Sequence, residues 1–200
     1  MPMLWPFGTV EFYRSTEGGR LEHPKRLSVI LALVLGAAAC TGGDTRVVEL
    51  PESAMVVTLP SEWHLADVSL TPNLGSPVEV LSVGSFPLNP GGPNCAQIPS
   101  QALHDMEPTD VFVTVQETGP GAGFEPRPDT FGPTSGSGGN VFLGCVGPEE
   151  QDDIGELHWL SFTDQGRYFY VAVAIGKGAT SDDVSAIWSV LDDLVVESKG

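Results

Sequence analysis

A short apolar segment, residues 27–39, does most to limit how this 200-residue chain can fold. It reads LSVILALVLGAAA, directly follows Lys25 and Arg26, and ends at Cys40 before the polar turn TGGD. A basic start, an apolar stretch of about 13 residues and a small-residue end are typical of a secretory signal. The stretch is too short to span a bilayer, which takes about 20 apolar residues. We therefore expect the chain to be exported and its folded part to follow residue 40.

Residues 1–22 do not fit this signal, because the basic start of a signal is short. We hypothesise that the true start lies near Leu21 and that the upstream stretch is a reading-frame extension. Residues 1–26 are therefore treated as an N-terminal extension with the basic region. Residues 27–40 are treated as the removable apolar part with its cleavage site.

The residues before Cys40 (LGAAAC) resemble the lipobox of bacterial lipoproteins, whose cysteine receives diacylglycerol. The lipobox normally has Leu three residues before the cysteine, where this chain has Ala37. The resemblance implies a lipid on Cys40, an anchor at the outer face of the plasma membrane and a tether over residues 41–53. Ala37 and Ala39 also suit ordinary signal peptidase, so free secretion is the alternative.

The three cysteines leave one odd residue in an exported chain. If Cys40 carries lipid, Cys95 and Cys145 remain as a pair in an oxidising compartment. We expect a disulfide between them, which would close a loop of about 50 residues and stabilise the fold by roughly 4 kcal/mol. Two unpaired buried thiols are the alternative, and no C-x-x-C spacing indicates redox catalysis.

Residues 41–200 are strongly acidic, with five Lys and Arg residues against 23 Asp and Glu residues and thus a net charge of −18. Sequence-independent nucleic-acid binding depends on cations that neutralise phosphates, and anionic lipid attracts basic surfaces. We therefore expect no nucleic-acid partner and no basic membrane-docking face. The acidity favours solubility, and a cationic partner or metal ions are the alternative.

Strand-like runs recur after residue 53. The clearest is DVFVTVQE (110–117), where Val111, Val113 and Val115 share one face. The other runs are 54–59, 63–70, 78–86, 141–146, 156–163 and 167–175. The last two are joined by DQG, which predicts a hairpin turn with Gly166 at positive φ. Residues 119–140, rich in Gly, Pro and Ser, predict a surface loop.

The end of the chain predicts a helix. Thr180 or Ser181 caps it, and one apolar stripe follows at helical spacing: Val184, Ile187, Trp188 and Leu191. Residues 100–106 predict a weaker helix, and residues 195–196 a final edge strand. We therefore expect an α+β fold: a mostly antiparallel, twisted sheet with a C-terminal helix packed on one face. It would form a single globular domain over residues 54–200, as a monomer.

The same C-terminal region carries a resemblance. The stretch from Trp159 to Val196 is similar to small exported domains of actinobacteria and, more loosely, to the close of PsbP-like α/β sandwich domains. Residues 59–63 (LPSEW) are similar to the early P-x-x-W of that fold. PsbP-like domains share no catalytic residue, so the resemblance implies a binding or structural module.

Few residues invite a chemical interpretation. His104, Asp105 and Glu107 offer three metal-ligand types, but without the two-His spacing of zinc helices. Residues 149–153 (EEQDD) lack the order and the Gly of a calcium loop. His158 alternates with Leu157 and Trp159, and we expect it on the outer side of the sheet. We assign no catalytic residue, metal site or cofactor.

These observations predict a non-enzymatic, lipid-anchored domain at the cell envelope that binds or assists envelope proteins. Its contact surface would be an exposed strand face or the loop 119–140. One alternative is an envelope hydrolase or metal-binding enzyme using His104, Asp105 and Glu107 or the acidic run 149–153. Convergence of three such side chains within about 4 Å in a concave pocket would favour it. The other alternative is a freely secreted protein.

Overall fold

The computed structural model describes residues 44–71, 75–92, 97–121, 123–133, 137–138 and 153–199. Residues 41–200 form a compact unit of their own, and the fold below is that of this unit. Several expected features lie outside the described residues: the expected signal and N-terminal extension, Cys40, Cys95, Cys145, the expected strand 141–146 and the acidic residues 149–152.

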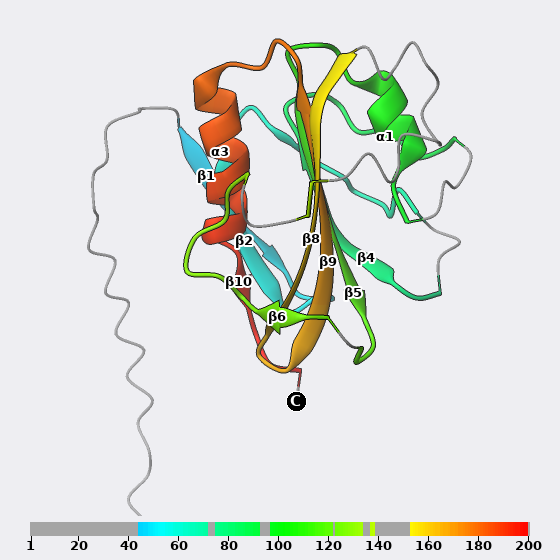
Figure 1. The fold of residues 1–200 in the computed structure, drawn as a ribbon, viewed down its shortest axis with the longest axis vertical. Helices are drawn as coiled ribbons and strands as arrows, with labels where there is room; N and C mark the ends of the chain where they lie inside the picture. The colour runs from blue at the N-terminus through cyan, green and yellow to red at the C-terminus, as the bar shows by residue number, and fades with distance from the viewer. Residues whose placement is uncertain are drawn as a thin grey trace, which may run out of the picture. The chain divides into compact units, whose positions relative to one another are not determined.

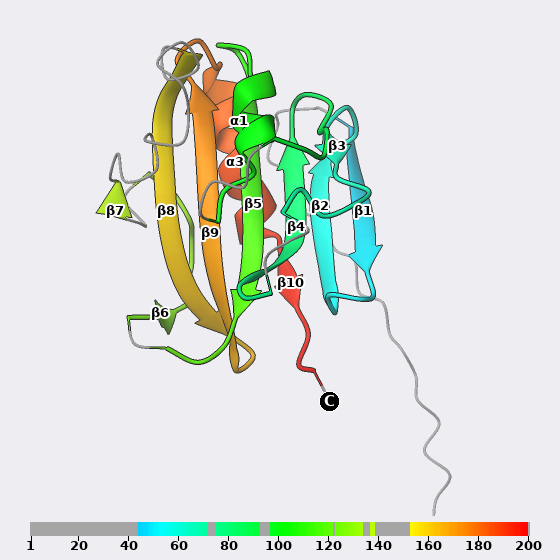
Figure 2. The same ribbon diagram turned by 90° about the vertical axis from the view of Figure 1, so that its right-hand side faces the viewer.

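Two sheets form the framework (Figures 1 and 2). The small sheet has the order β1–β2–β10, with β1 (Thr45–Leu50), β2 (Met55–Pro60) and β10 (Val195–Val196). The large sheet has the order β3–β4–β5–β9–β8–β6, and β7 also pairs with β8. Its strands are β3 (His64–Leu65), β4 (Val78–Gly84), β5 (Val111–Thr118), β6 (Glu125–Pro126), β7 (Ser137–Gly138), β8 (Ile154–Asp164) and β9 (Arg167–Gly176).

All neighbouring strands of the described residues run antiparallel except β6 and β8, which are parallel. The hairpin between β8 and β9 closes through Gln165 and Gly166, whose φ angles are 50° and 74°. Two positive φ values match the twist that a two-residue hairpin needs. The expected turn at Gly166 is confirmed.

Helix α3 (Ser181–Asp192) packs on one face of the large sheet and against β2. Thr180 and Asp183 form a reciprocal capping box at its start, which satisfies two backbone N–H groups. Ile187, Trp188 and Leu191 of its apolar stripe are buried with β2 and the inner residues of β5, β8 and β9 in the main core. The expected α+β fold, with a C-terminal helix packed on a mostly antiparallel sheet, is confirmed.

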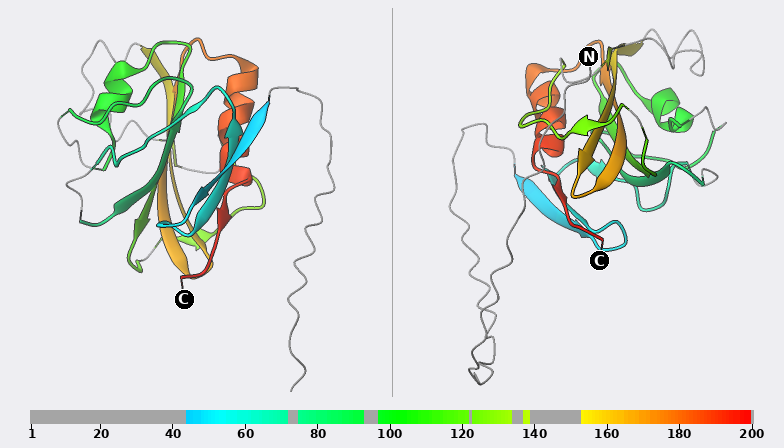
Figure 3. Two further views of the ribbon diagram at one scale, coloured as in Figure 1. Left: turned by 180° about the vertical axis from the view of Figure 1, so that it is seen from behind. Right: turned by 60° about the horizontal axis from the view of Figure 1, so that its bottom comes forward.

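Helix α1 (Ser100–Asp105) covers part of the opposite face. Ala102 and Leu103 pack there with Phe112, Ala172 and Ala174 in a second apolar cluster. The sheet is therefore buried on both sides, by α3 and the small sheet on one face and by α1 on the other (Figure 3). Within the described residues, no helix is long and apolar enough to cross a membrane.

Two expectations differ from the structure. The globular part was expected from Ala54, and the structure adds β1 before it, paired with β2 from Thr45 to Leu50. The run 63–70 was expected as one strand, and only His64–Leu65 is strand. Trp63 packs in the main core and Leu70 in the second cluster, so the chain crosses from one face of the sheet to the other within this run.

Candidate functional site

A groove of about 620 Å³ lies between α3 and the small sheet. We call it the α3 groove. Figures 1 and 3 show β1 and β2 beside α3 at this place. Its walls come from the start of β1, the end of β2 and one side of α3. The lining residues are Asp44, Thr45, Thr58, Leu59, Pro60, Glu62, Trp63, Asp182, Asp183, Ser185, Ala186, Ser189, Val190 and Asp193.

The groove combines an apolar floor with an acidic rim. Leu59, Trp63 and Val190 are buried beneath it, as members of the main core. Four rim carboxylates belong to exposed residues: Asp44, Glu62, Asp182 and Asp193. The fifth, Asp183, accepts a hydrogen bond from the Thr180 hydroxyl at 2.6 Å and is engaged in the helix cap.

No cationic side chain lines this rim within the described residues. The lining contains five acidic residues and no Lys, Arg or His. Of the five cations of residues 41–200, Lys177, Arg167 and Lys199 have partners away from the groove, whereas Arg46 and Arg127 donate to backbone carbonyls beside it, those of Trp63 and Asp192. Arg46 donates to the Trp63 carbonyl, Arg127 pairs with Asp164, Lys177 pairs with Asp153, and Arg167 and Lys199 both pair with Glu117. The lining of the groove therefore carries a net negative charge, and the low-dielectric floor strengthens its field.

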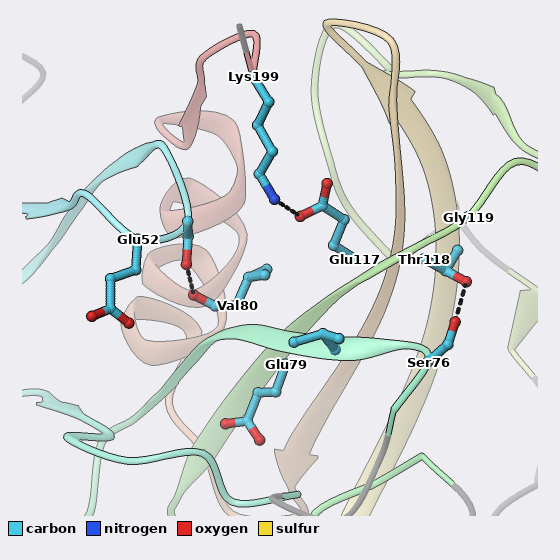
Figure 4. Close-up of a pocket in the computed structure, with 10 residues that line it drawn as sticks. Glu52, Ser76, Glu79, Val80, Glu117, Thr118, Gly119 and Lys199 are labelled. Carbon is cyan, nitrogen blue, oxygen red and sulfur yellow. Dashed lines mark hydrogen bonds and ion pairs between the residues drawn. The ribbon is translucent and has the colours of Figure 1, made fainter.

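A second hollow, of about 430 Å³, lies between the end of β5 and the turn before β2 (Figure 4). We call it the Glu117 pocket. It is lined by Glu52, Ser53, Ser76, Val78, Glu79, Val80, Glu117, Thr118, Gly119 and Lys199. Lys199 donates a hydrogen bond to Glu117 at 2.6 Å, which Figure 4 marks with a dashed line.

Two of the three carboxylates that line the Glu117 pocket, those of Glu117 and Glu79, already have protein partners. The Arg167 guanidinium donates to Glu117, and this hydrogen bond lowers the pKa of Glu117 against the opposing effect of burial; Lys199 lowers it further. Glu79 turns to the far side, where it accepts from the hydroxyls of Thr71 and Ser82 at 2.9 and 2.6 Å. An ionised, paired carboxylate of this kind holds structure together and is a poor proton donor or acceptor near neutral pH.

Among the described residues, those of the hydrolase alternative do not form a metal site. Asp105 accepts hydrogen bonds from the Asn89 and Gln101 side-chain amides, and His104 and Glu107 are exposed. Among the described residues, no group of three or more His, Cys, Asp or Glu could hold a metal ion. His104, Asp105 and Glu107 therefore do not converge as ligands. Of the acidic run 149–153, only Asp153 is described, and it pairs with Lys177 at 3.6 Å.

The expectation for His158 was wrong. His158 does face away from Leu157 and Trp159, but that face of β8 is the one that α3 covers. His158 is 7% exposed. The centres of its ring and of the Trp188 ring are 5.3 Å apart, and its Nε2 lies 2.8 Å from Oε2 of Glu156. Alternation along a strand separates the two faces, and it does not tell which face a helix covers.

The sequence analysis did not predict that the acidic residues of the α3 groove lie close together. Asp44 and Glu62 lie near the start of the domain, and Asp182 and Asp193 near its end. Asp182 lies in the first turn of α3, where a negative charge is favourable for the helix itself. The only signal in the sequence was the surplus of acidic residues over the whole domain.

Comparison with protein-family models, curated proteins and solved structures gave no match for this chain. The function is therefore argued from the geometry and the sequence alone.

Proposed function

We propose that this protein is a lipid-anchored binding module of the bacterial cell envelope, and that its α3 groove holds a basic, partly apolar segment of a partner protein. The observation that carries the proposal is the arrangement of the groove: five acidic residues and no Lys, Arg or His line it, around an apolar floor.

The shape and charge of the groove together favour a peptide segment. An extended or helical segment presents apolar side chains on one side, which fit the floor near Leu59 and Ala186. Lys and Arg on the same segment reach the rim with their flexible stems. Charge complementarity of this kind contributes mainly to the association rate and to the choice of partner.

The proposed cellular location rests on the sequence. The segment 27–39 acts as the export signal, and Cys40 carries the lipid that holds the acidic domain at the outer face of the membrane. The PsbP-like resemblance supports a role without catalysis, because that group shares no catalytic residue.

The proposal is tested with the full chain in detergent and a fluorescent peptide of alternating Lys and Val residues, read by anisotropy. We expect the peptide to bind, and peptides of Glu and Val or of Lys and Ser to bind at least about tenfold more weakly, a difference of about 1.4 kcal/mol. Binding should weaken as salt rises, because the rim is exposed.

Two triple variants separate the groove from the general acidity. Glu62→Gln with Asp182→Asn and Asp193→Asn removes three rim charges and should reduce binding. Asp67→Asn with Glu107→Gln and Glu125→Gln removes three exposed charges outside the groove and should leave binding nearly unchanged. An equal loss in both triples, or no binding by the unchanged chain, would overturn the proposal.

A further inference from the structure

The α3 groove lies at the point where the chain enters the domain. Asp44 and Thr45, the first described residues of residues 41–200, both line it. Both residues are part of the fold. The Asp44 carbonyl accepts a hydrogen bond from the Ser61 N–H at 2.8 Å, and Thr45 pairs with Pro60 in the small sheet.

The covalent chain therefore limits how far this end of the groove can be from the lipid. Four residue steps join Cys40 to Asp44, and a fully extended chain spans about 3.3–3.6 Å per residue, so the reach is at most about 14 Å. The domain itself is larger, with a radius of gyration of about 15 Å for its size. A lipid on Cys40 thus holds the Asp44 end of the groove on the membrane side of the domain.

We propose, resting on the function proposed above, that the occupant of the α3 groove is a juxtamembrane segment: a basic stretch on the outer side of an integral membrane protein, next to the end of a transmembrane helix. A segment within this short reach of the bilayer contacts the groove while the lipid on Cys40 stays in the membrane. A partner that presents its basic segment well above the membrane does not reach it.

Electrostatics supports this choice of partner. The domain carries −18 charges, and the distance of at most about 14 Å is comparable with the Debye length of about 8–10 Å, so anionic headgroups still repel it in part. A basic segment between the groove and the headgroups relieves this repulsion. Membrane proteins keep most Lys and Arg of short loops on the cytoplasmic side. A basic segment on the outer side is therefore a distinctive mark that an acidic groove can select.

The test uses the lipid-modified protein reconstituted into phosphatidylcholine vesicles with a synthetic transmembrane peptide. In one peptide the Lys–Val segment follows the membrane span directly. In the other, about 20 prolines come between, which place the segment roughly 60 Å from the bilayer. A photo-crosslinker at Ser185 in the groove reports occupancy, and the same crosslinker at Gln165, in the hairpin between β8 and β9, is the control.

We expect crosslinking at Ser185 to be about tenfold stronger for the direct peptide, because its effective concentration at the groove is higher. Crosslinking at Gln165 should stay weak for both peptides. Insertion of about 40 Gly and Ser residues between Gly42 and Gly43 should remove the preference, because the longer tether reaches both positions.

Equal crosslinking of both peptides by the unchanged protein would overturn the juxtamembrane assignment. The function proposed above would still stand if the free peptide bound in detergent. Failure of the free peptide to bind would instead remove the proposed function itself, so the two outcomes are separate.

Discussion

Arg167 at the start of β9 holds Glu117 near the end of β5 through two parallel hydrogen bonds. Its Nε donates to Oε1 at 3.0 Å and its Nη2 to Oε2 at 2.8 Å, and the Arg167 residue is only 6% exposed. Its remaining nitrogen donates to the carbonyls of Ala54 and Glu197. One guanidinium therefore joins the large sheet to the turn before β2 and to the C-terminal chain.

Replacement of Arg167 by Met should lower the free energy of unfolding by about 3–5 kcal/mol, because it leaves a partly buried carboxylate without its main partner. Urea denaturation measures this as a lower midpoint. Lys199→Met is the matched control: Lys199 contacts the same carboxylate but is 51% exposed, so its loss should cost at most about 1 kcal/mol. Equal effects of the two substitutions would contradict the assigned role of Arg167.

Glu117 should make stability depend on acid pH. Its pKa is lowered from 4.5, chiefly by the hydrogen bond from Arg167. A carboxyl group whose pKa is lower in the folded than in the unfolded state stabilises the fold above the unfolded pKa and loses this effect as pH falls through the folded pKa. The stability difference between the unchanged protein and Glu117→Gln should be constant at neutral pH and shrink below about pH 4.5. Urea unfolding at a series of pH values measures it, and a constant difference down to pH 3 would contradict the prediction.

Local sequence patterns predicted the strands and the helix whose form depends on residues that are close together in the sequence. The alternation of Val111, Val113 and Val115 gave one buried face of β5, and the capping residues gave the start of α3. The strand β1 was missed because it is an edge strand whose alternation is weak: Val47 is 67% exposed while its neighbour Val48 packs on the core.

Features that depend on distant contacts could not be predicted in this way. The burial of Arg167 depends on Glu117 and on two carbonyls that are far away in the sequence. The α3 groove needs Asp44 and Asp182 on the same rim, and nothing in either local sequence indicates that they meet. The charge composition predicted a negatively charged surface, but it did not predict where on the surface the charges gather.

Gly176 should tolerate no side chain. A Cβ at this position would collide with the carbonyl oxygen of Pro108, while the Gly176 N–H donates to the Asp110 carbonyl at 2.8 Å. Gly176→Ala should therefore force a backbone shift that costs about 1–3 kcal/mol of unfolding free energy. Gly75→Ala, where a Cβ meets nothing within 4 Å, is the control and should change the thermal midpoint little. A Gly176→Ala protein of unchanged stability would show that this close approach is not required.

Cys95 and Cys145 should be joined in the exported protein. Alkylation without reductant should modify neither residue, and alkylation after reduction should modify both, as read by mass spectrometry of the peptides. The entropy model gives roughly 4 kcal/mol for such a loop, so Cys95→Ala should lower stability by that order, and Cys145→Ala by the same amount. Alkylation of both thiols in protein taken directly from the envelope would contradict the disulfide.

Cys40 should carry the lipid. Mass spectrometry of the mature protein should find an N-terminus at Cys40 with the mass of a diacylglyceryl group. An unmodified N-terminus at Cys40 would instead support ordinary cleavage after Ala39 and free secretion.

Cys40→Ala should move the protein out of the membrane fraction, whereas Cys95→Ala, which removes a different cysteine, should leave it there. The prediction rests on the proposal that the apolar segment 27–39 is removed and that a lipid on Cys40 then serves as the anchor. Recovery of the chain from cytosol with residues 27–40 intact would contradict the export signal, and with it the lipid anchor and the membrane-side position of the α3 groove.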